Sequence, residues 1–187
     1  MLWFLAVIGL AIVVSLLRGG RISNFTEIRL RAWWLLFIGF GMQLAAAFLG
    51  SGHSDLATAL VLLSYLPLMA VVLLNRDEPG MWIAGIGILM NFTVIVINSG
   101  MPVLPASIEL AGGNPADITL DPKHVLLTAE TRLPFLADII PLPGNVISLG
   151  DVFLAVGLGV FIEDQLKQPK RLFRHRVQGV PGSAADR

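Results

Sequence analysis

Two aspartates in an almost wholly apolar stretch are the residues best suited to chemistry. The stretch FLADIIPLPGNVISLGDVFLAVG carries Asp138 and Asp151 and no basic residue. Two carboxylates held close together near a membrane boundary can share a proton, because both cannot ionise cheaply. One could then activate water while the other protonates a leaving group. Asp138 and Asp151 are therefore the candidate catalytic pair.

The same two residues also have a purely structural explanation. Ser148 precedes Asp151 by three positions. It could cap a following helix and leave Asp151 in the first turn, facing the positive end of the helix dipole. Asp138 could pair with Lys123, His124 or Arg132. Both acids would then be satisfied without any reaction.

The composition indicates a membrane protein. Of the 187 residues, 55% are hydrophobic and 14% are charged, whereas a soluble domain carries about 25% charged residues. The absence of cysteine excludes disulfides, thiolate metal sites and a cysteine nucleophile. A transmembrane helix needs about 20 apolar residues. We therefore predict an all-α fold, a polytopic transmembrane helical bundle of about five spans, at residues 2–17, 32–49, 56–74, 81–98 and 146–162.

The basic residues predict the orientation of these spans. They gather after the first, third and fifth spans, so the positive-inside rule places the N-terminus outside and the C-terminus in the cytoplasm of a bacterial inner membrane. Residues 1–164 would form one membrane domain and 165–187 a basic, partly disordered tail. The candidate contacts to lipid headgroups are Arg29, Arg31, Arg171 and Arg174. A short basic patch beside a span is typical of membrane-surface contact, so we expect membrane lipids and no nucleic acid as partners.

The loop after the first span contains a helix-start pattern. Asn24 and Glu27 are three residues apart, as in a capping box. The pattern predicts a helix from about Phe25 that runs directly into the second span.

Residues 99–145 form the one long connection, and the topology places it outside. Its apolar content argues against disorder, and Pro134, Pro141 and Pro143 forbid a continuous helix. We expect a Pro-rich interfacial or re-entrant cap, with a short helix over residues 120–130. Its acids and single histidine match no known metal-ligand spacing, so neither a metal nor a cofactor is predicted. The candidate ligand or cap-site residues are Asn98, Gly100, His124, Arg132 and Ser148.

The last third resembles the lipoprotein signal peptidases, which are intramembrane aspartic enzymes. The segment ADII carries Asp138, SLGD carries Asp151, and INSGMPV is similar to an Asn/Gly motif of that family. The resemblance implies an aspartic hydrolase. The Asn-x-x-Asp-Arg element of that family is absent, and Ser148 and Gly150 stand where Asn and Ala are usual.

The whole chain resembles an uncharacterised bacterial integral-membrane family of about five spans. The segments NSGMPV, KH, TRLPFLADIIPLP and SLGDVFLAVG carry this resemblance, which implies fold and location but no activity. The positions that it marks are Asn98, Gly100, Met101, Pro102, His124, Thr131, Leu133, Asp138, Pro141, Pro143, Gly150 and Asp151.

Three functions therefore stay open. The first is non-enzymatic binding of a membrane protein partner, a lipid or a small solute at the outer face. The second is hydrolysis by Asp138 and Asp151. The third is transport of a small solute, although charged groups are absent from the span interiors, where Gln43 and Asn91 are the main polar residues. Gly150, Gly157 and Gly159 could permit close helix contact within the chain or in a homo-oligomer, which the sequence does not specifically indicate.

Overall fold

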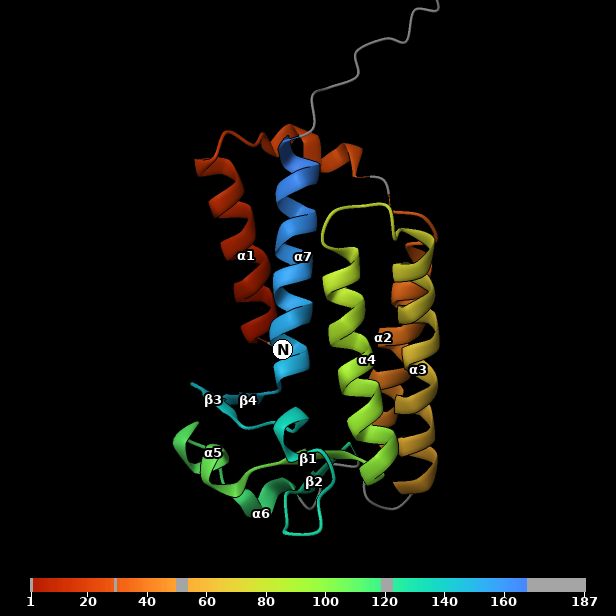
Figure 1. Ribbon diagram of the computed structural model, residues 1–187, viewed down its shortest axis with the longest axis vertical. Helices are drawn as coiled ribbons and strands as arrows, with labels where there is room; N and C mark the ends of the chain where they lie inside the picture. The colour runs from red at the N-terminus through yellow and green to blue at the C-terminus, as the bar shows by residue number, and fades with distance from the viewer. Residues whose placement is uncertain (1, 29, 50–53, 119–122, 168–187) are drawn as a thin grey trace, which may run out of the picture.

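The protein is an upright helical bundle with a small layer of short elements at one end (Figure 1). This computed structural model describes all residues except 1, 29, 50–53, 119–122 and 168–187. The predicted positions Arg29, Arg171 and Arg174, the start of the predicted helix at 120–122, and most of the tail lie outside the described residues. The fold is mostly helical, as predicted.

Five long helices run side by side along the bundle (Figure 1). Their bounds are α1 Leu2–Leu17, α2 Trp34–Leu49, α3 Ser54–Leu74, α4 Met81–Asn98 and α7 Leu149–Lys167. Two of them contain segments long and apolar enough to cross a membrane, Asp55–Leu74 and Met81–Asn98, and Ala6–Leu17 and Trp34–Leu49 are shorter apolar segments. Successive helices along the bundle pack mainly as α1 on α7, α7 on α4, α4 on α3 and α3 on α2.

The last helix begins and ends later than the predicted span of 146–162. Asn145–Ile147 form strand β4, so α7 starts only at Leu149. At the other end, the carbonyl of Leu166 accepts hydrogen bonds from the backbone N–H of Arg21 (3.0 Å) and from Nδ2 of Asn24 (3.0 Å). These donors satisfy a carbonyl that has no partner within the helix.

The prediction of a helix from Phe25 into the second span is wrong. A 3-10 helix, η1, covers Ile22–Glu27, and α2 begins only at Trp34. Between them Ala32 adopts a left-handed φ of 54°, which a continuous helix cannot contain. Arg31 is held there by Asn75, whose side chain accepts from the Arg31 N–H (2.8 Å) and donates to its carbonyl (2.9 Å).

Helices α4 and α7 are in backbone contact through glycines spaced seven residues apart. Gly80 and Gly87 lie on one side of the contact, and Gly150 and Gly157 lie on the other. A Cβ atom added at Gly87 would fall 2.6 Å from the Leu154 nitrogen, and one at Gly157 would fall 2.6 Å from the Gly80 oxygen. The contact is therefore within the chain, which is one of the two roles that the sequence left open for Gly150 and Gly157.

A layer of short elements, which we call the cap (residues 99–148), connects α4 to α7 at one end of the bundle (Figure 1). It contains β1 Met101–Val103, α5 Pro105–Leu110, α6 Pro115–Ile118, β2 His124–Leu126, the 3-10 helix η3 Pro134–Leu136, β3 Ile140–Leu142 and β4 Asn145–Ile147. Strands β1 and β2 pair in parallel, and β3 and β4 pair as an antiparallel hairpin.

The prediction of a helix over residues 120–130 is wrong where the chain is described. Met101 pairs with His124 and Val103 with Leu126, so this segment is a strand. The partner strand is more than 20 residues away in the sequence, and such tertiary pairing overrides local helix propensity.

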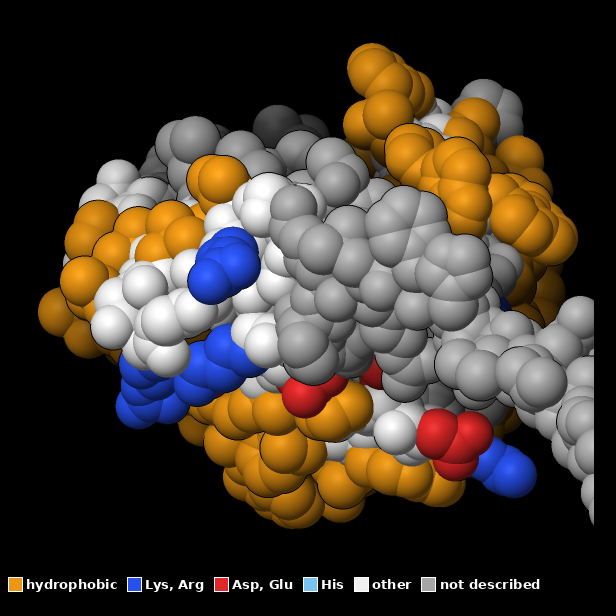
Figure 2. All heavy atoms as spheres, turned by 90° about the horizontal axis from the view of Figure 1, so that it is seen from above, with side chains coloured by type: hydrophobic (Ala, Val, Ile, Leu, Met, Phe, Trp, Pro, Cys, Tyr) orange, Lys and Arg blue, Asp and Glu red, His pale blue; other side chains and the backbone are white. Residues whose placement is uncertain are grey.

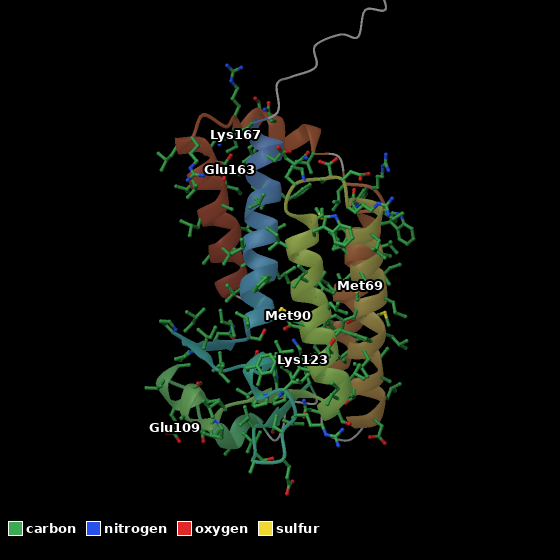
Figure 3. The ribbon with its side chains drawn as sticks, viewed as in Figure 1. Met69, Met90, Glu109, Lys123, Glu163 and Lys167 are labelled. Carbon is green, nitrogen blue, oxygen red and sulfur yellow. The ribbon has the colours of Figure 1, made fainter. Side chains whose placement is uncertain are left out.

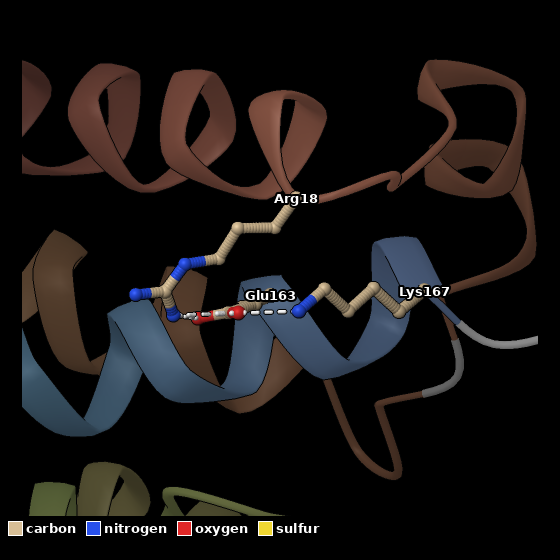
Figure 4. Close-up of polar contacts among 3 residues, drawn as sticks. All are labelled: Arg18, Glu163 and Lys167. Atoms are coloured by element: carbon tan, nitrogen blue, oxygen red, sulfur yellow. Dashed lines mark hydrogen bonds and ion pairs between the residues drawn. The ribbon is translucent and has the colours of Figure 1, made fainter.

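The bundle end opposite the cap, which we call the charged end, carries a group of acidic and basic side chains. Seen from this end, Lys, Arg, Asp and Glu side chains lie between apolar flanks (Figure 2). Glu163 accepts from Nη1 of Arg18 (3.0 Å) and from Nζ of Lys167 (2.6 Å), which ties α1 to the last turn of α7 (Figure 4). The pairs are exposed or half-exposed, so solvent screens them and each adds little to the stability of the fold.

Candidate functional site

The start of α7 is fixed by a three-residue hydrogen-bond network. The Asp151 N–H donates to Ser148 Oγ (3.0 Å), and the Ser148 N–H donates to Asp151 Oδ2 (3.2 Å). Asn91 of α4 completes the network: its Nδ2 donates to Asp151 Oδ1 (2.8 Å), and its Oδ1 accepts from Ser148 Oγ (2.8 Å). The predicted role of Ser148 as the N-terminal capping residue of the helix is therefore confirmed. Each carboxylate oxygen of Asp151 has a hydrogen-bond donor.

A cavity of about 370 Å³ lies among the five long helices, and we call it the bundle cavity. Most of its lining is apolar. Side chains such as Leu30, Met81 and Phe161 line the part toward the charged end. Its polar lining residues are Gln43, Tyr65, Asn91, Lys123 and Asp151.

These polar residues share a position toward the cap. Asp151 is in the first turn of α7, and Asn91 lies in the half of α4 nearer the cap. Lys123 lies where the cap meets the helices (Figure 3). Gln43 donates to Ser64 Oγ (3.1 Å), which links α2 to α3 beside the cavity. The bundle cavity therefore has an apolar part and a polar end.

Asp138 is held in the cap by its backbone. Its N–H donates to the carbonyl of Pro102 (2.9 Å), and its own carbonyl accepts from the Leu104 N–H (3.0 Å). These bonds extend the edge of β1 and place the side chain inside the cap, where the residue is only 5% exposed. Burial is the main reason that the pKa of the Asp138 carboxyl is raised to about 8; the charge of Asp151 raises this pKa too, and Lys123 lowers it.

A second cavity of about 360 Å³ lies within the cap, and we call it the cap cavity. Asp138 and His124 both line it, and His124 Nε2 lies 3.7 Å from Asp138 Oδ2. Of the three pairings predicted for Asp138, the structure thus has the one with His124. Lys123 and His124 are consecutive residues, yet Lys123 lines the bundle cavity and His124 lines the cap cavity.

The two aspartates are electrostatically coupled but differ in environment. In the described part of the chain, Asp151 lines the bundle cavity and Asp138 lines the cap cavity. Asp151 accepts from the Ser148 N–H at the helix start and from Asn91 Nδ2, whereas Asp138 has the His124 imidazole 3.7 Å from its Oδ2 atom. Such an arrangement can bind polar groups in two places.

The other predicted site residues connect the cap to α4. Asn98 Nδ2 donates to the carbonyl of Arg132 (2.9 Å), and Asn98 Oδ1 accepts from the Arg132 N–H (2.9 Å). A Cβ atom at Gly100 would fall 2.8 Å from Val125 Cγ1, so glycine lets β2 approach closely. Asn98, Gly100 and the backbone of Arg132 therefore position the cap, and His124 and Ser148 are the two of this set that lie beside the aspartates.

Sequence reasoning missed Tyr65 and the part that Gly80 and Gly87 take in the glycine contact. Tyr65 is the only tyrosine in the chain, and it is buried in α3 beside the bundle cavity. A tyrosine within a long apolar segment could have drawn attention, since buried polar groups need partners. The equal spacing of Gly80 to Gly87 and of Gly150 to Gly157 was the signal for the α4–α7 contact.

The fold is that of a mostly helical protein with candidate membrane-spanning helices and a buried polar network at one end. The family model for DUF5317, a family of unknown function, matches residues 27–163, and the chain belongs to this family. An uncharacterised protein of Thermotoga maritima is 30% identical over 158 residues, which cover 81% of this chain and 85% of that protein. No solved structure matches the chain.

Proposed function

We propose that this is a five-span inner-membrane protein that binds an amphiphile, a molecule with an apolar chain and a polar group, in the bundle cavity. The five spans are α1, α2, α3, α4 and α7. The cap lies outside, as a Pro-rich cover at the membrane surface, and the charged end faces the cytoplasm.

The outward surface of the helices supports the membrane location. Phe37, Phe48, Leu66 and Trp82 are among many large apolar side chains that point away from the core, and Phe48 is 83% exposed. Soluble monomers rarely expose contiguous apolar patches of more than a few hundred Å². Arg18, Arg21, Arg31 and Arg76 lie in the connections at the end opposite the cap, which suits a cytoplasmic face.

The observation that carries the function is the division of the bundle cavity into an apolar part and a polar end. Its volume of about 370 Å³ is within the range of small-molecule sites. The apolar portion of a ligand would pack against the apolar side chains that line the cavity, and its polar portion would meet Asn91, Lys123 and Asp151. Because these include one cation and one carboxylate, an uncharged or zwitterionic polar group fits best.

Binding is better supported than hydrolysis by Asp138 and Asp151. A catalytic pair must face one reacting bond, whereas these two residues line different cavities. Asp151 is also engaged by Asn91 and by the start of α7. This engagement favours a structural role for Asp151 at the polar end of the ligand site.

A pair of tryptophan substitutions tests the proposal. Ile88 lines the bundle cavity and is 6% exposed, while Ile86, two residues earlier on α4, is 46% exposed on the outer face. Ile88→Trp would fill the cavity, and Ile86→Trp would add the same side chain to the outer surface, where Trp82 already lies. The probe is lysophosphatidylcholine, which has one acyl chain and a zwitterionic headgroup, and native mass spectrometry in mild detergent counts the bound molecules.

We expect one bound probe on the wild type and on Ile86→Trp, and a loss of that probe on Ile88→Trp at similar thermal stability. The proposal would be refuted by a wild type that retains no probe, or by equal retention in all three proteins. If Ile88→Trp unfolds, Val71→Phe, which enters the same cavity from α3, replaces it with the same expected loss.

A further inference from the structure

The carboxyl group of Asp138 lacks the partners that a buried acid normally has. Residue Asp138 is 5% exposed, and its Oδ1 atom is buried without a hydrogen bond. Its Oδ2 atom lies 3.7 Å from His124 Nε2, which is an ion-pair distance and too long for a hydrogen bond. Buried polar atoms almost always have a hydrogen-bond partner, so this carboxyl calls for an explanation.

The cap cavity provides space beside this carboxyl. Its volume of about 360 Å³ would hold a small molecule. Val103, Ile108 and Val146 give it apolar walls. Gly112 and Gly144 lie at turns with φ of +85° and +75°, and a Cβ added at either would meet nothing within 4 Å, so there is open space beside both.

We propose that the cap cavity binds a small organic cation, a primary ammonium group on a short apolar carrier, with Asp138 as its carboxylate partner. The ammonium group supplies the donor that Oδ1 of Asp138 lacks, and charge-assisted hydrogen bonds of this kind are about twice as strong as neutral ones. The carrier packs against the valine and isoleucine walls. Nothing in this site depends on a ligand in the bundle cavity.

The donor set fits an ammonium group better than a metal ion. A catalytic or structural zinc site uses three or four protein ligands, and no group of three or more His, Cys, Asp and Glu side chains gathers in the described part of the chain. His124 and Asp138 are the two side chains in this cavity that could serve as metal ligands. One carboxylate within an apolar wall is, by contrast, enough to pair with one ammonium charge.

Four charged or titratable side chains lie around Asp138. His124 belongs to β2 and lies 3.7 Å away, and Lys123 directly precedes it. Asp151 at the start of α7 and Tyr65 of α3 are the other two, and both interact electrostatically with Asp138. The raised pKa of Asp138 means that the carboxyl keeps its proton near neutral pH in the free protein. Pairing with an ammonium group requires the carboxylate, so binding releases about one proton from this residue at pH 7.

The test uses n-butylammonium as the probe and the full chain in mild detergent, with isothermal titration calorimetry as the assay. Titrations in two buffers of different ionisation enthalpy report the proton released. The variants are Asp138→Asn, which keeps the shape and removes the charge, and Glu109→Gln as a matched control. Glu109 is an exposed acid on α5 at the outer edge of the cap (Figure 3). The same titrations with n-butanol and with ZnCl₂ identify a neutral or a metal ligand.

We expect n-butylammonium to bind with release of a proton, and Asp138→Asn to weaken this binding about tenfold or more, because a charge-assisted contact is removed. Glu109→Gln and Ile88→Trp should change it by less than about twofold, as neither touches the site. Any one of four results would overturn the proposal: no binding, binding unchanged in Asp138→Asn, equal binding of n-butanol, or tighter one-to-one binding of zinc through His124. Since Ile88→Trp blocks only the bundle cavity, failure here is separate from failure of amphiphile binding.

Discussion

Neutralising Asp151 should destabilise the protein much more than neutralising an acid on its surface. In Asp151→Asn, the new side chain offers one oxygen and one NH₂ group where the carboxylate offered two oxygens. Those oxygens accept from the Ser148 N–H and from Asn91 Nδ2. Whichever way the amide turns, its NH₂ group must face one of these two donors.

The loss follows from these contacts. A hydrogen bond to a charged group contributes about 1.5–3 kcal/mol. A carboxylate in the first turn of a helix adds about 0.3–1 kcal/mol through the helix dipole. Together they predict that Asp151→Asn lowers the free energy of unfolding by about 2–4 kcal/mol. Asp77→Asn, the same change at an exposed position between α3 and α4, should stay within about 0.5 kcal/mol of the wild type.

The assay is thermal unfolding in mild detergent of the wild type, Asp151→Asn, Ser148→Ala and the double variant. Ser148 and Asp151 share one network, so the two losses should be non-additive by about 0.5–3 kcal/mol. If Asp151→Asn unfolds at the temperature of Asp77→Asn, or if the two losses simply add, the structural role assigned to Asp151 is refuted. An Asp151→Asn protein that is more stable than the wild type would return this residue to the candidate catalytic pair.

Two further predictions concern Asp138 and the glycine contact. The pKa of Asp138 is raised in the folded state, so between about pH 4 and pH 8 the unfolded chain loses a proton that the folded one keeps; stability should therefore fall with rising pH, by up to about 1.4 kcal/mol per unit. In denaturation experiments, Asp138→Asn should lack this contribution to the change in the free energy of unfolding with pH. An equal pH dependence in the two proteins would contradict the raised pKa of Asp138. Gly157→Ala should cost about 1–3 kcal/mol in thermal unfolding, because its Cβ would press on the backbone of Gly80 and Ala84. Gly159→Ala, whose Cβ would meet only Ala11 Cβ at 3.9 Å, should be neutral or slightly stabilising, and equal losses at both glycines would disprove the close contact.

The long apolar helices could be predicted from the sequence because their cause is local. The predicted segments 2–17 and 81–98 coincide with α1 and α4. The helix N-cap at Ser148 was predictable for the same reason, since a capping residue and its partner are three positions apart.

The cap could not be predicted in the same way, because distant residues determine it. His124–Leu126 form a strand only because Met101–Val103 lie beside them. The burial of Asp138 depends on the same edge, through its backbone bonds to Pro102 and Leu104. The sequence could therefore name Asp138 as a candidate, but not its position beside the cap cavity or the missing hydrogen bond of its Oδ1 atom.

The glycine contact between α4 and α7 also has a consequence for biosynthesis. Asn91 and Asp151 are 60 positions apart in the chain. At a synthesis rate of about 5–20 residues per second, α4 leaves the ribosome roughly 3–12 s before its partner. During that interval the glycine-lined side of α4 lacks its partner helix, and Asn91 has neither Ser148 nor Asp151 to bond with. Late docking of α7 would then complete the α4–α7 contact, and a chain truncated before Leu149 would keep an unmatched helix face that cellular quality control can recognise.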